Sequence, residues 1–116
     1  MLRVSNEIIA RALELSSDQS ARIAATFSTK SIRDRYQLES EQIAAQAIEV
    51  RAMTTRLGEG TFDEIIAVWG NLISGFCLSR RQWREAIEAG NFGMASCLNT
   101  EMTQLMSASR CLMYRE

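Results

Sequence analysis

The sequence predicts an all-α domain of four to five helices, arranged as antiparallel hairpins or a bundle. Apolar residues recur every three or four positions through most of the chain, which is the period of a helix with one buried face. Proline, which breaks helix interiors, is absent. Polar or glycine-containing corners separate the periodic segments. With 116 residues, 47% of them apolar, the chain can build one core, so we expect residues 1–116 to form a single domain.

The first helical pattern covers residues 6–15, where the apolar residues form one stripe. The next five residues, Ser16 to Ser20, are polar on every face, so a straight helix through them would have no apolar side to bury. Ser16 and Gln19 have the spacing of a capping box, which would begin a new helix. The sequence leaves open whether residues 6–27 form one bent helix or two helices.

The second pattern runs from about Ile32 to Leu57 and carries large and small residues in a regular order on one face. Large residues recur every seven positions, and a small residue follows each of the first three after four positions (Tyr36, Ile43, Val50 and Leu57; Ser40, Ala47 and Thr54). Such a seam lets a neighbouring helix approach closely. We expect this helix to pair antiparallel with the next one, residues 62–89.

The corner between these two helices lies at residues 57–64. Gly58 can adopt the left-handed conformation that closes the last turn of a helix. Thr61 and Glu64 have the spacing of a capping box, in which each side chain accepts a hydrogen bond from the backbone N–H of the other residue. We therefore predict a helix end at Gly58 and a helix start behind Thr61.

The segment behind this corner is the most apolar part of the chain, and we predict that it ends at Gly90. Its large residues follow a helical spacing (Phe62, Ile65, Ile66, Trp69, Leu72, Ile73, Phe76, Trp83 and Ile87). Further apolar residues widen this stripe beyond what one partner helix covers. We therefore predict that residues 62–89 form the central helix, with Gly70 and Gly75 as close-packing points or a kink.

The last helix is predicted from about Phe92 to Tyr114 and is rich in methionine. Flexible thioether side chains are typical of adaptable binding surfaces. We predict that one face of this helix binds a partner (Met94, Leu98, Met102, Leu105, Met106, Leu112 and Met113). The same stripe also fits a core helix that happens to use methionine, and the sequence does not decide between the two interpretations.

Residues 83–98 contain the corner Gly90-Asn91-Phe92, followed by a small residue at Ala95. This segment resembles the turn of a tetratricopeptide-type helical hairpin, and it is also similar to the last helices of flagellar and type III export chaperones. Both resemblances cover about one hairpin. The pattern does not return elsewhere, whereas a solenoid needs repeats, so we assign no family.

A nucleic-acid alternative rests on residues 19–35, whose order resembles a DNA-binding helix-turn-helix. Ser28 would occupy the turn, although the turn lacks glycine and Ile32 comes about two positions early. Basic residues occur on this segment and in one cluster farther along the chain (Lys30, Arg33 and Arg35; Arg80, Arg81 and Arg84). A net charge of −1 gives no overall field that attracts nucleic acid, so two helices meeting at a polar corner is our preferred interpretation.

No residue pattern indicates catalysis, a metal site or a cofactor. Histidine is absent, which removes the commonest general base and metal ligand. Cys77, Cys97 and Cys111 have no metal-binding spacing, and an odd number of cysteines without an export signal is typical of a reducing compartment. Apolar runs are too short to span a membrane. We expect a cytoplasmic protein that is not an enzyme.

These observations predict a non-catalytic protein–protein interaction module, an adaptor or a chaperone-like protein. It would present the apolar, methionine-rich face of its last helix to a protein partner, whose identity the sequence does not reveal, or to a second copy of the chain. Homodimerisation is considered because the apolar stripes are broader than a single small bundle covers. The alternative is a small DNA-binding regulator that uses residues 19–35.

Overall fold

The computed structural model describes the backbone of residues 2–113 and the side chains of residues 5–113. This part of the chain forms four α-helices: α1 (Leu2–Ala24), α2 (Lys30–Ala52), α3 (Phe62–Glu88) and α4 (Phe92–Met113). A short 3-10 helix, η1 (Leu57–Glu59), lies between α2 and α3. The predicted all-α class is confirmed, and no strand occurs between residues 2 and 113. The predicted end of the last helix at Tyr114 lies outside the described residues.

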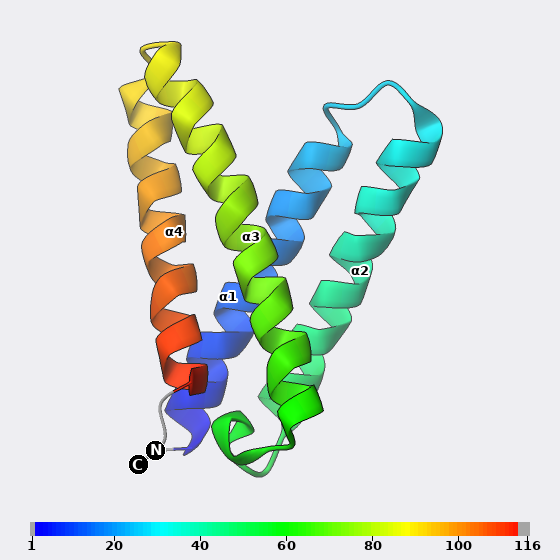
Figure 1. The fold of residues 1–116 in the computed structure, drawn as a ribbon, viewed down its shortest axis with the longest axis vertical. Helices are drawn as coiled ribbons and strands as arrows, with labels where there is room; N and C mark the ends of the chain where they lie inside the picture. The colour runs from blue at the N-terminus through cyan, green and yellow to red at the C-terminus, as the bar shows by residue number, and fades with distance from the viewer. Residues whose placement is uncertain (1, 114–116) are drawn as a thin grey trace.

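The helices form two antiparallel hairpins, α1 with α2 and α3 with α4. Helix α1 contacts all three other helices, whereas α2 and α3 contact each other far less than either contacts α1. Figure 1 shows the two hairpins diverging toward the end that carries the α1–α2 and α3–α4 turns. The predicted pairing of residues 32–57 with residues 62–89 is therefore wrong, and the central helix is α1 rather than α3.

Helix α1 is a single helix that runs without a break through the polar segment 16–20. The expectation that this segment has no side to bury is wrong, because Ser16, Ser17, Gln19 and Ser20 are all buried. Their polar groups reach the neighbouring helices: the Ser16 hydroxyl donates to the carbonyl oxygen of Asn71 on α3 at 2.7 Å. The Ser17 hydroxyl donates to α2 and the Gln19 amide donates to Glu101 of α4, whereas the buried Ser20 hydroxyl has no hydrogen-bond partner among the described residues. Small side chains therefore let the other helices approach α1 at this level.

The predicted seam of the second helix is confirmed only between Ser40 and Val50, where it packs against α1. Tyr36 is half-buried, Thr54 is exposed, and Leu57 lies in η1. Its buried residues are Ser40, Ile43, Ala47 and Val50. Ser17 and Ser40 form a reciprocal pair, in which each hydroxyl donates to the other residue's carbonyl oxygen at 2.8 Å. Small residues on both helices permit this close approach. The α1–α2 pair is therefore specified by a polar contact as well as by apolar packing.

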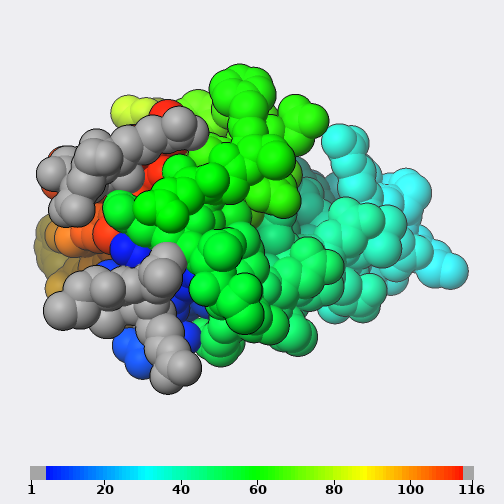
Figure 2. Space-filling view, turned by 90° about the horizontal axis from the view of Figure 1, so that it is seen from below, coloured from blue at the N-terminus to red at the C-terminus, as the bar shows by residue number. Residues whose placement is uncertain are grey.

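The α2–α3 connection differs from the prediction at Gly58. Helix α2 ends at Ala52, and Gly58 lies in η1 without a left-handed backbone conformation. Gly58 is buried, and a Cβ there would lie 3.2 Å from the carbonyl oxygen of Leu112, so the glycine permits contact with the end of α4. Figure 2 shows the α2–α3 connection, coloured green, covering the lower end of the bundle.

Asn6 of α1 fixes the same connection by two hydrogen bonds. Its side-chain oxygen accepts from the backbone N–H of Leu57 at 3.0 Å, and its side-chain nitrogen donates to the carbonyl oxygen of Thr55 at 2.8 Å.

The capping box of Thr61 and Glu64 is confirmed, with both reciprocal hydrogen bonds present. At the other corner, Gly90 has a φ of 74°, the left-handed conformation that terminates α3 there as predicted.

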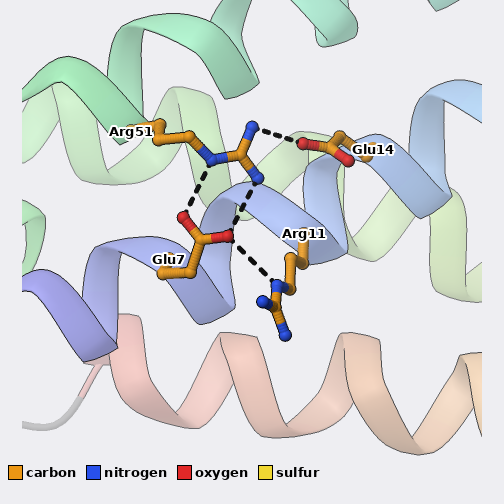
Figure 3. Close-up of polar contacts among 4 residues, drawn as sticks. All are labelled: Glu7, Arg11, Glu14 and Arg51. Carbon is orange, nitrogen blue, oxygen red and sulfur yellow. Dashed lines mark hydrogen bonds and ion pairs between the residues drawn. The ribbon is translucent and has the colours of Figure 1, made fainter.

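An arginine-centred ion cluster joins α1 to α2 on the surface (Figure 3). Arg51 of α2 pairs with Glu7 at 2.8 Å and with Glu14 at 2.6 Å, and Glu7 also accepts from Arg11 at 3.0 Å. The hydrogen bonds from Arg51 are the main reason that the pKa of Glu7 lies below its ordinary value. The same contacts raise the pKa of Arg51. Both groups remain partly exposed to solvent, so the cluster orients the hairpin more than it stabilises it.

Candidate protein-interaction face

The residues of α4 that the sequence predicts for partner binding fall into two groups, one buried and one outside the core. Leu98, Leu105 and Leu112 are buried in the core, so their side chains do not reach a partner in this fold. The methionines lie outside the core: Met94, Met106 and Met113 are exposed and Met102 is half-buried (Met113 exposes 57% of its surface). The structure therefore reduces the predicted set to its methionines.

Helix α3 contributes a second apolar surface that the prediction did not include in the site. We name it the outer stripe, and its members alternate three and four positions apart, except at Arg80 (Phe62, Ile66, Trp69, Ile73, Phe76, Trp83 and Ile87). Phe62, Ile66, Trp69 and Ile87 are exposed, and the other three are half-buried. Phe62 exposes 73% of its surface. Several large apolar side chains thus remain uncovered along one side of α3.

A different row of α3 faces the core, and it includes residues that are small or polar (Ile65, Val68, Leu72, Gly75, Ser79 and Ala86). Gly75 lies directly against Ser16 of α1, because a Cβ on Gly75 would lie only 2.6 Å from the Ser16 Cβ. This contact brings the α1 and α3 backbones together at one point. It sets the rotation of α3, so the bulky residues next to this row point away from α1.

The outer stripe and the α4 methionines meet in an open groove between α3 and α4. The groove has a volume of about 340 Å³ and is lined by Phe76 of α3 together with residues of α4 (Asn99, Met102, Thr103, Met106, Ser107 and Arg110). Met113 follows Met106 by seven residues and so lies on the same side of α4. We call the outer stripe, Met102, Met106 and Met113 together the outer face.

Acidic residues occupy the first turn of α3, and arginines occur in its second half. The acidic residues Asp63 and Glu64 occupy the first turn, where they interact favourably with the helix dipole. Arg80, Arg81 and Arg84 are exposed in the second half of the helix, where Arg81 makes a long ion pair of 3.6 Å with Glu85. The charges beside the outer stripe thus begin with Asp63 and include Arg84 in the second half of the helix, where Glu85 and Glu88 add negative charge.

The residues of the nucleic-acid alternative are solvent-exposed but lie on different hairpins. Lys30, Arg33 and Arg35 occupy the first turns of α2, whereas the Arg80 to Arg84 cluster lies on α3. Helices α1 and α2, which meet within residues 19–35, run antiparallel and side by side (Figure 1). A DNA-binding helix-turn-helix crosses at about 90–120° instead. The geometry of residues 19–35 therefore gives this alternative no support.

The described side chains contain no arrangement that indicates catalysis. Cys77 and Cys97 are exposed, Cys111 is partly buried, and all three are free thiols. Between residues 5 and 113, no three metal-ligating side chains come together. None of the described helices is long and apolar enough to cross a membrane.

Comparison of the chain with protein-family models, curated proteins and solved structures finds no significant match. Its class is therefore defined by its own geometry: a four-helix protein built from two hairpins, with a large apolar surface left on the second one.

Proposed function

We propose that this chain is a non-catalytic interaction module, an adaptor or chaperone-like protein, that binds a helical segment of a protein through the outer face. The observation that carries this proposal is the exposure of large apolar side chains along one side of the α3–α4 hairpin. Covering a large apolar side chain is worth roughly 1.5–3 kcal/mol. Contiguous apolar surface of this kind marks interaction sites on soluble proteins.

The shape of the outer face fits a helix better than a small molecule. The groove between α3 and α4 is open to solvent, with residues at helical spacing along its α4 side and Phe76 on its α3 side. An amphipathic helix binds such grooves by inserting side chains at three- and four-residue intervals. Met102 and Met106 can adjust their side chains to more than one partner, which fits an adaptor role.

The test of this function compares the parent chain with Met106→Glu and a matched control, Ile48→Glu. Ile48 exposes 68% of its surface on α2, away from the outer face, so both variants place a charge at an exposed apolar position. We expect all three chains to have the same helical circular dichroism. Proteins from the native host should bind the parent and the control but not Met106→Glu, and added salt should change this binding little.

Two results would contradict the proposal. Equal capture by the parent and Met106→Glu would show that the outer face is not the binding surface. Loss of helical structure in Met106→Glu alone would show that Met106 supports the fold rather than a partner.

A further inference from the structure

We infer that the occupant of the outer face is a second copy of this chain, with the two α3 helices antiparallel about a two-fold axis near Ile73 and Phe76. This inference rests on the proposed function, since it names the partner of the same face. Three features of α3 carry it: the spacing of the outer stripe, the position of Arg80, and the distribution of charge and small residues on one flank.

The outer stripe has the spacing of a coiled-coil seam. From Phe62 to Ile87 the intervals are four, three, four, three, four, three and four residues when Arg80 is included. This is a heptad pattern, the pattern by which one helix packs its knobs into the holes of another. Helices of the same chain cover this row only in part: Phe76 packs against the main core and Trp83 packs against Ala95 and Leu98 of α4. Phe62, Ile66, Trp69 and Ile87 remain exposed.

Arg80 distinguishes an antiparallel pair from a parallel one. In an antiparallel pair centred near residues 73–76, Ile73 lies opposite Phe76 of the second copy, and Arg80 lies opposite Trp69 of the second copy. A guanidinium over an indole ring is a favourable cation–π contact. In a parallel pair, Arg80 would face Arg80 of the second copy inside the seam, which places like charges in contact.

The flank beside the seam supports the same orientation. Asp63, Gly70, Cys77 and Arg84 recur every seven residues and are all exposed, so they form one row along α3. Antiparallel pairing brings Asp63 near Arg84 of the second copy twice in each dimer, whereas in a parallel pair this row would face the opposite flank of the second helix and these attractive contacts would not form. The middle of the row is small, and a Cβ at Gly70 would meet no atom within 4 Å, so a second helix can approach there.

The first experiment measures the mass of the full chain in solution by light scattering and its self-association by sedimentation. We expect the parent and the Ile48→Glu control to dimerise and Ile73→Glu to be monomeric with unchanged helical content. Asp63→Arg and Arg84→Asp, both at exposed positions, should each weaken the dimer about tenfold, since each change replaces two attractive contacts by repulsive ones. The double reversal should restore the parent affinity.

The second experiment measures orientation by oxidative cross-linking in a background carrying Cys97→Ser and Cys111→Ala. In the antiparallel dimer centred between Ile73 and Phe76, the two copies of Cys77 are offset by five residues, about 7.5 Å along the helix axis, which exceeds the Cα separation that a disulfide bridges. Adding Gly70→Cys places a thiol beside Cys77 of the second copy. We expect fast covalent dimer formation with Gly70→Cys and slow formation without it.

The outcomes separate this inference from the proposed function. A monomeric parent, a dimer that Ile73→Glu and the charge reversals leave intact, or cross-linking through Cys77 alone at the same rate would each overturn the antiparallel dimer. If the parent is monomeric while Met106→Glu still abolishes capture of a host protein, the second copy is excluded and the interaction function stands.

Discussion

Two regions of this protein reverse the usual relation between polarity and burial. Residues 16–20 of α1 are the most polar run of their helix, yet four of the five are buried. The outer stripe of α3 belongs to the most apolar segment of the chain, yet several of its side chains are exposed. The contact between Ser16 and Gly75 connects the two regions, because it brings the helices close and sets the rotation of α3.

This difference indicates that the buried row of α3 is determined by how closely α1 and α3 can approach each other, and not by hydrophobicity alone. Two backbones can pack tightly where a row of small residues on one helix faces a row of small residues on the other. The Ser16 hydroxyl also donates a hydrogen bond to the facing helix, at the carbonyl oxygen of Asn71. Bulky residues cannot occupy such a contact. They remain on the outside, where a separate helix can cover them.

The substitution with the largest expected effect breaks the contact between Ser16 and Gly75 directly. Gly75→Ala places a Cβ 2.6 Å from the Ser16 Cβ and 2.9 Å from its Cα, so the helices must separate. We expect a loss of about 1–3 kcal/mol in the free energy of unfolding, measured by urea denaturation at fixed protein concentration. This loss occurs even though alanine is the better helix former.

Gly70→Ala is the matched control, because it changes the same residue type in the same helix where no atom lies within 4 Å. It should stabilise the fold by about 0.5–1 kcal/mol through helix propensity. Equal effects of the two substitutions would show that Gly75 is not a contact point.

The smallest expected effect concerns the ion cluster at the edge of the α1–α2 hairpin. The pKa of Glu7 is lower in the folded chain than its ordinary value near 4.5, so folding favours the ionised carboxylate. Its contribution to stability is present above the ordinary pKa and is lost as the pH falls through the lowered value. Glu7→Gln should therefore lower the melting temperature slightly at neutral pH, where the ionised carboxylate contributes, and flatten the decline below about pH 4.5, where the parent loses this contribution.

A control in which Arg11 is replaced by glutamine should flatten this decline less than Glu7→Gln does, since Arg51 makes the dominant contact to Glu7. An identical acid response of the parent and Glu7→Gln would exclude Glu7 as the source of this pH dependence.

The local elements could be predicted from the sequence because their signals are local. The capping box joins Thr61 to Glu64 within one turn, the left-handed Gly90 ends α3, and the heptad seam of α2 defines its buried face. Each of these depends on residues a few positions apart. They predict the all-α class and the position of two corners, whereas the number of helices stayed at four to five because residues 6–27 fitted one helix or two.

The packing of the helices could not be predicted, since it depends on pairs far apart in the sequence. Ser16 lies 59 residues before Gly75, and Asn6 lies 51 residues before Leu57, whose backbone it binds. Because residues 16–20 are polar, the sequence did not indicate that α1 is the central helix. The sequence predicted only part of the candidate site. The methionines of α4 recur at a helical spacing that can be recognised in the sequence. The outer stripe lies next to the buried row of α3, and spacing alone does not separate the two rows.

The central claim, that the outer face is uncovered in a single chain and covered by its partner, is tested most directly by tryptophan fluorescence. Both tryptophans, Trp69 and Trp83, lie on the outer stripe, and Trp83→Phe leaves Trp69 as the only reporter. In the monomeric Ile73→Glu background, Trp69 should emit at long wavelength and be quenched strongly by acrylamide. In the parent background, emission should shift to shorter wavelength and quenching should fall as the protein concentration rises. Weak quenching of Trp69 in the monomer would contradict the account, because it would place the outer stripe in the core.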